Sequence, residues 1–141
     1  MTALDNKVGD SPDGEERPAG FKALVVEDET LVAWHLEGLL YELGMEVCEI
    51  VSSGREAIVR AIRDRPDVVF MDVNLAGELD GVEATRQILE KSDVPIIFVT
   101  AYADDAPTVT RIRSALGDRI ILGKPATRAG VQEALRRIQV I

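Results

Sequence analysis

Five short apolar runs, each followed by a segment with helical periodicity, constrain the fold of this chain more than any other feature. The runs lie at residues 22–27, 46–51, 67–71, 96–99 and 119–122. They are rich in Val, Ile and Leu along most of their length, which is typical of parallel strands covered on both faces. Repeated strand–helix units therefore predict an α/β fold, with a doubly wound parallel sheet of five strands and helices on both faces.

Capping residues and helix breakers indicate where the helices begin and end. Ser53 with Glu56, and Asp80 with Glu83, have the spacing of a capping box in front of apolar-periodic segments. Gly44 follows the last apolar residue of the first helical segment and is a typical stop signal. These signals predict helices with defined ends between the strands.

Residues 1–20 are polar and interrupted by Gly and Pro, so we expect a disordered N-terminal tail. Residues 21–141 have the size of one domain, and an apolar content of 46% is sufficient for a single core. The net charge of −9 argues against a nucleic-acid partner bound by bulk electrostatics. Cys48 is the single cysteine, and no apolar run matches a signal peptide or a membrane span. We therefore expect a cytoplasmic protein without a membrane partner.

Charged and hydroxyl side chains stand at the ends of four predicted strands. They are Glu27 and Asp28 after the first strand, Asp72 after the third, Thr100 after the fourth and Lys124 after the fifth. In a doubly wound sheet, ligands bind beyond the carboxyl ends of the strands, at the point where the strand order reverses. We therefore expect these five side chains to face one crevice.

Carboxylates in one crevice repel each other, and a hard cation such as Mg²⁺ with oxygen ligands relieves that repulsion. A phosphate would bring more negative charge, which the Lys124 ammonium could balance, while Thr100 could donate a hydrogen bond to it. Asp72 is the carboxylate that stands singly, which makes it the natural nucleophile. The pattern predicts cation-dependent phosphate chemistry.

With these motifs the chain resembles the receiver domains of two-component response regulators, in their stand-alone, CheY-like form. The resemblance covers about residues 21–139 and rests on four motifs in order. They are Val-Val-Glu27-Asp28-Glu29, Val-Val-Phe-Met-Asp72, Phe-Val-Thr100-Ala101 and Gly-Lys124-Pro125. The resemblance implies a flavodoxin-like sheet with the strand order 2-1-3-4-5.

The resemblance also implies a role for each site residue. Asp72 would accept a phosphoryl group from a phosphohistidine on a sensor histidine kinase or a histidine phosphotransfer protein. Glu27, Asp28, Asp72 and the backbone carbonyl of Asn74 would hold Mg²⁺. Lys124 would form an ion pair with the phosphoryl group.

Thr100 would move in to hydrogen-bond the phosphoryl group. Apart from its own phosphorylation and dephosphorylation, such a domain turns over no substrate and is not an enzyme. Because no effector domain follows Ile141 in this sequence, we expect output through contact with a downstream protein target or through a phosphorelay. The domain would be a monomer or a phosphorylation-dependent homodimer.

Two positions depart from the family pattern. Ile121 stands where such domains usually carry Tyr or Phe as a rotameric switch, and Tyr102 is the nearby ring that could replace it. Ala126 stands where a bulky aromatic commonly follows Lys-Pro. Both positions concern switching rather than phosphorylation.

Three alternative functions stay open at this point. A Mg²⁺-dependent phosphatase with an aspartyl-phosphate intermediate would usually have a second Asp two residues after the nucleophile, where this chain has Asn74. A phosphorylation-independent binding module and a flavin-binding variant of the fold are the others, and the acidic residues 27–29 disfavour a cofactor phosphate. We expect His35 to be an ordinary helix residue and Cys48 to be a buried strand thiol.

Overall fold

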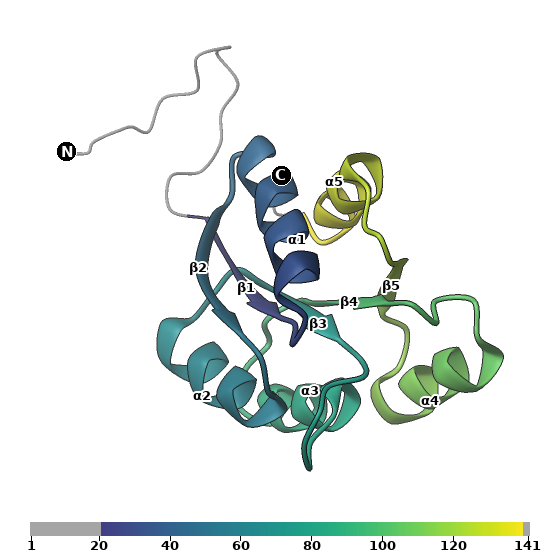
Figure 1. The fold of residues 1–141 in the computed structure, drawn as a ribbon. Coiled ribbons are helices and arrows are strands. Elements are labelled where there is room, and N and C mark those ends of the chain that lie inside the picture. Colours follow the sequence, from purple (N-terminus) through teal and green to yellow (C-terminus); the bar gives the residue numbers. More distant parts are fainter. Residues whose placement is uncertain (1–20, 140–141) are drawn as a thin grey trace.

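The computed structural model describes residues 21–139 and confirms the predicted α/β fold with five parallel strands in the order β2-β1-β3-β4-β5 (Figure 1). The strands are β1 (Lys22–Val26), β2 (Glu46–Val51), β3 (Val68–Asp72), β4 (Ile96–Thr100) and β5 (Ile120–Gly123). The helices are α1 (Thr30–Glu42), α2 (Gly54–Asp64), α3 (Gly81–Leu89), α4 (Ala106–Leu116) and α5 (Arg128–Arg137). The tail predicted over residues 1–20 lies outside the described residues.

The sheet separates two apolar clusters, because successive side chains of a strand point to opposite faces. α1 and α5 cover one face, and α2, α3 and α4 cover the other (Figure 1). Val25 and Phe70 pack under α1 and α5. Leu24, Met71 and Phe98 pack under the other three helices. With both faces covered, β1, β3 and β4 are almost fully buried, which accounts for their continuous apolar sequence.

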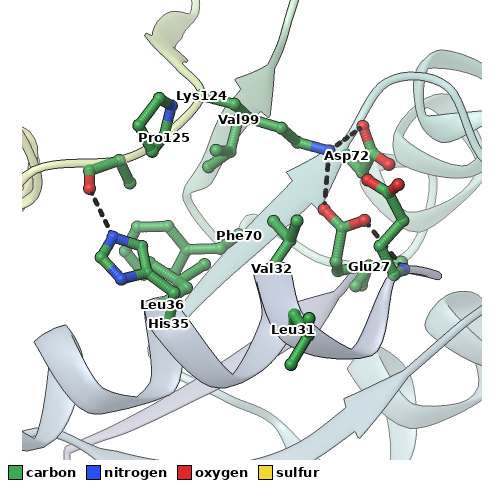
Figure 2. Close-up of a pocket in the computed structure, with 13 residues that line it drawn as sticks. Glu27, Leu31, Val32, His35, Leu36, Phe70, Asp72, Val99, Lys124 and Pro125 are labelled. Atoms are coloured by element: carbon green, nitrogen blue, oxygen red, sulfur yellow. Dashed lines mark hydrogen bonds and ion pairs between the residues drawn. The ribbon is translucent and has the colours of Figure 1, made fainter.

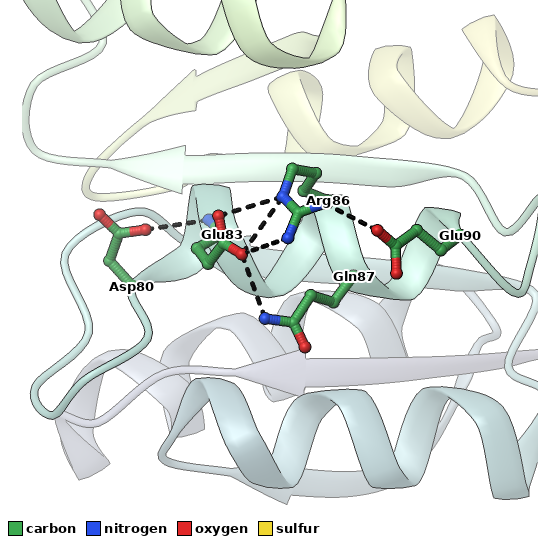
Figure 3. Close-up of polar contacts among 5 residues, drawn as sticks. All are labelled: Asp80, Glu83, Arg86, Gln87 and Glu90. Carbon is green, nitrogen blue, oxygen red and sulfur yellow. Dashed lines mark hydrogen bonds and ion pairs between the residues drawn. The ribbon is translucent and has the colours of Figure 1, made fainter.

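The predicted N-caps of α2 and α3 are confirmed. The side chain of Ser53 accepts a hydrogen bond from the amide of Glu56, and that of Asp80 accepts one from the amide of Glu83. Glu83 does not bond back to its cap, because its carboxylate instead accepts hydrogen bonds from Arg86, one turn along the helix (Figure 3). No helix in the part of the chain that the structure describes is long and apolar enough to span a bilayer.

Two details differ from the sequence prediction. Asp72 is the last residue of β3 rather than the residue after it, and it pairs in register with Val99 of β4. Cys48 is only half-buried, because β2 is an edge strand of the sheet. Gly44 follows the end of α1 as predicted and has a φ of 86°, a left-handed conformation that favours glycine.

Candidate functional site

The three predicted carboxylates form one cluster at the carboxyl ends of β1 and β3. Glu27 follows the last residue of β1, and Asp72 closes the neighbouring strand β3. One oxygen each of Glu27, Asp28 and Asp72 lies within 4.8 Å of the others. Glu27 and Asp72 are buried and Asp28 is exposed. The adjacency of β1 and β3 in the sheet therefore brings together acids that are 45 residues apart along the chain (positions 27 and 72).

Lys124, the first residue after β5, reaches two of these carboxylates. Its Nζ lies 2.8 Å from Oε1 of Glu27 and 3.3 Å from Oδ1 of Asp72 (Figure 2). Burial on its own would lower the pKa of the Lys124 ammonium, but the Glu27 hydrogen bond and the Asp72 charge outweigh it, and the pKa is raised. Burial raises the pKa of Glu27 despite the same hydrogen bond. With three carboxylates and one ammonium, the cluster therefore carries negative charge that Lys124 compensates only in part.

Backbone amides of the adjoining loops orient the acids. The amide of Glu29 donates to Oε2 of Glu27 at 3.0 Å, and that of Asn74 donates to Oδ1 of Asp72 at 3.3 Å. Lys124 pairs with this same Oδ1. Within residues 21–139, no hydrogen bond or ion pair engages the other oxygen of Asp72, Oδ2. Oδ1 of Asp72 is therefore the oxygen that the Asn74 amide and Lys124 hold in place.

A cavity of about 330 Å³ opens beside the acids. Its lining residues are Asp28, Glu29, Asp72, Asn74, Ala101, Tyr102 and Lys124. The carboxylate oxygens and the backbone carbonyl expected from Asn74 are all hard oxygen donors, which fit a cation such as Mg²⁺ that keeps several of its waters. The donor set present therefore suits the ion that the sequence predicted.

Thr100 lies at the end of β4 but bonds to its own loop. Its Oγ1 accepts a hydrogen bond from the amide of Tyr102 at 3.1 Å, and its carbonyl accepts one from the amide of Lys124 at 3.0 Å. Tyr102 is 53% exposed, while Ile121 is partly buried and packs against the core under α2, α3 and α4. The part that Tyr102 and Ile121 play in switching stays a prediction.

Two further residues, whose contacts sequence reasoning missed, hold the loop that follows Asp72. A Cβ on Gly81 would collide with the carbonyl oxygen of Asp72, so only glycine fits where α3 begins. The neighbouring Asp80 pairs with Arg111 of α4 at 2.6 Å. Burial would raise the pKa of Asp80, but its hydrogen bonds to Arg111 and to the amide of Glu83 lower it. The sequence signal for these contacts was the Asp80–Gly81 pair before a helical pattern. That signal does not reveal that Arg111 and the Asp72 carbonyl are the groups in contact.

Comparison with known proteins identifies the family. A family model described as the response regulator receiver domain matches residues 23–136. The chain belongs to the response regulator receiver family. The receiver domain of the sensor histidine kinase PA1611 from Pseudomonas aeruginosa, described with magnesium in its active-site cleft, superposes with a TM-score of 0.73. It is 36% identical, and the match covers 84% of this chain and 97% of that chain.

Curated relatives are longer proteins that contain a receiver domain. The regulator PhyR of Methylorubrum extorquens is 32% identical over 79% of this chain and 41% of its own length. The transcriptional regulatory protein PdtaR of Mycobacterium tuberculosis is 36% identical over 74% of this chain and 49% of its own length. The chain spans about a third of a protein-glutamate methylesterase from Syntrophus aciditrophicus, at 42% identity. The receiver region is therefore what these proteins share with this chain.

Proposed function

We propose that this receiver domain accepts a phosphoryl group on Asp72 from a phosphohistidine of a sensor histidine kinase or a histidine phosphotransfer protein. The observation that carries the proposal is the single cluster of Glu27, Asp28, Asp72 and Lys124 at the strand ends. Oδ2 of Asp72 would attack phosphorus and form the new P–O bond. The P–N bond to the donor histidine would break, and its electron pair would return to the ring nitrogen.

The surrounding residues would hold and balance the charge of that transfer. Glu27, Asp28 and Asp72, with the backbone carbonyl of Asn74, would hold Mg²⁺, which when bound neutralises charge on the transferring oxygens. Lys124 would exchange part of its present pairing with Asp72 for the phosphoryl oxygens. Its ammonium is held charged by two carboxylates before the phosphoryl group arrives.

Thr100 would supply the conformational response. Its hydroxyl now accepts from the amide of Tyr102, so bonding to a phosphoryl oxygen would require a change in the loop after β4. That loop leads into α4, in which Ile112 is the buried residue. A weakly buried helix is a suitable element to rearrange and to be recognised by a downstream protein target. The domain would dephosphorylate itself by hydrolysis rather than turn over a separate substrate.

Labelling with acetyl phosphate tests the proposal directly. In the presence of Mg²⁺ the protein should gain one phosphoryl group by intact mass, and hydroxylamine should remove it, as expected of an acyl phosphate. Asp72→Asn should abolish the label, because the amide lacks the nucleophilic oxygen. Asp93→Asn, at an exposed position before β4, serves as the matched control and should label like the wild type.

Two results would contradict the proposal. A label that resists hydroxylamine would place the phosphate on a hydroxyl group rather than on Asp72. Sustained release of phosphate from a small ester such as p-nitrophenyl phosphate, lost in Asp72→Asn, would instead favour the phosphatase alternative. The residue two positions after the nucleophile, Asn74, makes a poor proton donor for that reaction.

A further inference from the structure

A second cavity, of about 410 Å³, lies between the start of α1 and the loop that joins β5 to α5 (Figure 2). Most of its wall is apolar. Val32 and Leu36 of α1, Phe70 of β3 and Val99 of β4 line it, and Ala126 contributes only a methyl group from the connecting loop. The volume is within the range of about 300 to 1,000 Å³ that is typical of small-molecule pockets.

The charged groups of this cavity lie at one end. At the opposite end the polar group is His35, which already has a partner, because its Nε2–H donates to the carbonyl of Ala126 at 2.8 Å (Figure 2). The charged end is formed by Glu27, Asp72 and Lys124. Water in the apolar part would find few hydrogen-bond partners, so that part is poorly suited to hydration and well suited to an apolar group.

The charge at the polar end selects the kind of head group. The acidic residues Glu27, Glu29 and Asp72 are among the lining residues, and Lys124 is the one lysine among them. An organic anion would add to an existing excess of negative charge, whereas a cation would reduce it. We propose that this cavity binds a small organic amine, with its apolar body between α1 and Ala126 and its ammonium at Glu27.

The amine site and the proposed phosphoryl site overlap at the acidic cluster, although the apolar part of the amine site lies outside the phosphoryl site. The two cavities share Glu29, Asp72 and Lys124, whereas Asp28 and Asn74 line only the smaller one. Amine binding would therefore depend on the charge of the shared cluster, and it would not require Asp72 to be phosphorylated.

Three probe compounds, each a phenyl ring on a short alkyl chain with a different polar end group, test whether the cavity prefers an amine. The full ¹⁵N-labelled chain, in buffer free of divalent cations, is titrated with phenethylamine, 2-phenylethanol or 3-phenylpropionate. We expect saturable NMR shifts at Val32, Phe70 and Val99 with phenethylamine, and an affinity at least about ten-fold higher than for the carboxylate probe. Equal or tighter binding of 3-phenylpropionate, or no saturable shift with phenethylamine, would overturn the proposal.

Filling the cavity tests its location. Ala126→Leu and Ala126→Phe should each weaken phenethylamine binding by about ten-fold or more, because the new side chain occupies the ligand volume. Ala115→Phe introduces the same ring at an exposed position of α4 and should bind like the wild type. Thermal unfolding verifies that each variant is folded, and wild-type affinity in a folded Ala126 variant would refute the site.

A second variant tests the polar end. Glu27→Gln removes a carboxylate while keeping the side-chain shape, and it should reduce the preference for phenethylamine over 2-phenylethanol. Retention of the full preference would show that the ammonium lies elsewhere and would refute the assigned orientation. Because these measurements use no phosphoryl donor, failure of acetyl phosphate labelling would leave their outcome unchanged, and the two proposals can fail separately.

Discussion

Replacement of Lys124 by methionine should destabilise the domain strongly, because it leaves two buried carboxylates without their ammonium. The Lys124 side chain is 15% exposed, and those of Glu27 and Asp72 are each 5% exposed. Breaking a buried ion pair by removing one partner costs about 3 to 5 kcal/mol. Methionine preserves most of the apolar volume of lysine, so the loss is chiefly electrostatic.

The expected size is about 3 kcal/mol in Mg²⁺-free buffer at neutral pH, the low end of that range, because the ammonium keeps some contact with water. For a domain of this length, this corresponds to a fall in Tm of roughly 10 °C. The pKa of Glu27 is already raised above 4.5 by burial. Loss of the Lys124 hydrogen bond would raise it further.

The pH dependence has a defined sign. A group with a raised folded-state pKa contributes its full stability below its unfolded value, here 4.5, and loses that contribution as the pH rises through the folded value. The difference between the wild type and Lys124→Met should therefore widen as the pH rises above 4.5. Urea unfolding at a series of pH values measures this difference.

A double-mutant cycle isolates the ion pair. Combining Lys124→Met with Glu27→Gln should recover part of the loss, with a coupling energy of at least about 1 kcal/mol. Lys91→Met, at an exposed lysine after α3, is the matched control and should change stability by less than about 0.5 kcal/mol. Additive single effects, or a Lys124 variant as stable as the Lys91 variant, would refute the reasoning.

Three other changes test the surroundings of the site. Gly81→Ala should cost about 3 kcal/mol in urea unfolding, since its Cβ would collide with the carbonyl oxygen of Asp72, and a neutral result would contradict that packing. The hydrogen bond from Arg86 lowers the pKa of Glu83 to about 2, so its stabilisation is present above pH 4.5 and lost as the pH falls toward 2. Glu83→Gln should therefore flatten the acid limb of the stability profile. Arg111→Ala should cost less than about 1 kcal/mol, since its side chain is 51% exposed, yet it should speed hydrogen exchange in α4.

Much of the fold was predictable because its signals are local. The apolar runs specify strands buried on both faces, and a pair such as Ser53 and Glu56 specifies a helix start within four residues. The resemblance of the motifs to receiver domains then supplied the strand order. The parallel arrangement of the strands had already predicted that Glu27, Asp72 and Lys124 would share one edge of the sheet, since parallel strands all end on the same side.

The sequence was less informative where a side chain could choose between partners. The movement of Thr100 toward a phosphoryl group stays a prediction, but the present partner of its hydroxyl, the amide of Tyr102, was not predicted and is set by the conformation of one loop. Cys48 was expected to be buried, but its strand lies at the edge. Both outcomes depend on what lies beside the residue in space, which periodicity does not report.

The amino-acid sequence by itself determined which residues stand at the strand ends and therefore which chemical groups this domain can offer. Tertiary structure alone decided how far apart they are: the 2.8 Å from Lys124 to Glu27, the close approach of Gly81 to the Asp72 carbonyl, and the hollow beside Ala126. The physical reason is that strand positions follow from local patterns of burial. Contacts and cavities instead arise from packing between segments that are distant along the chain, and that packing sets them to within a fraction of an ångström.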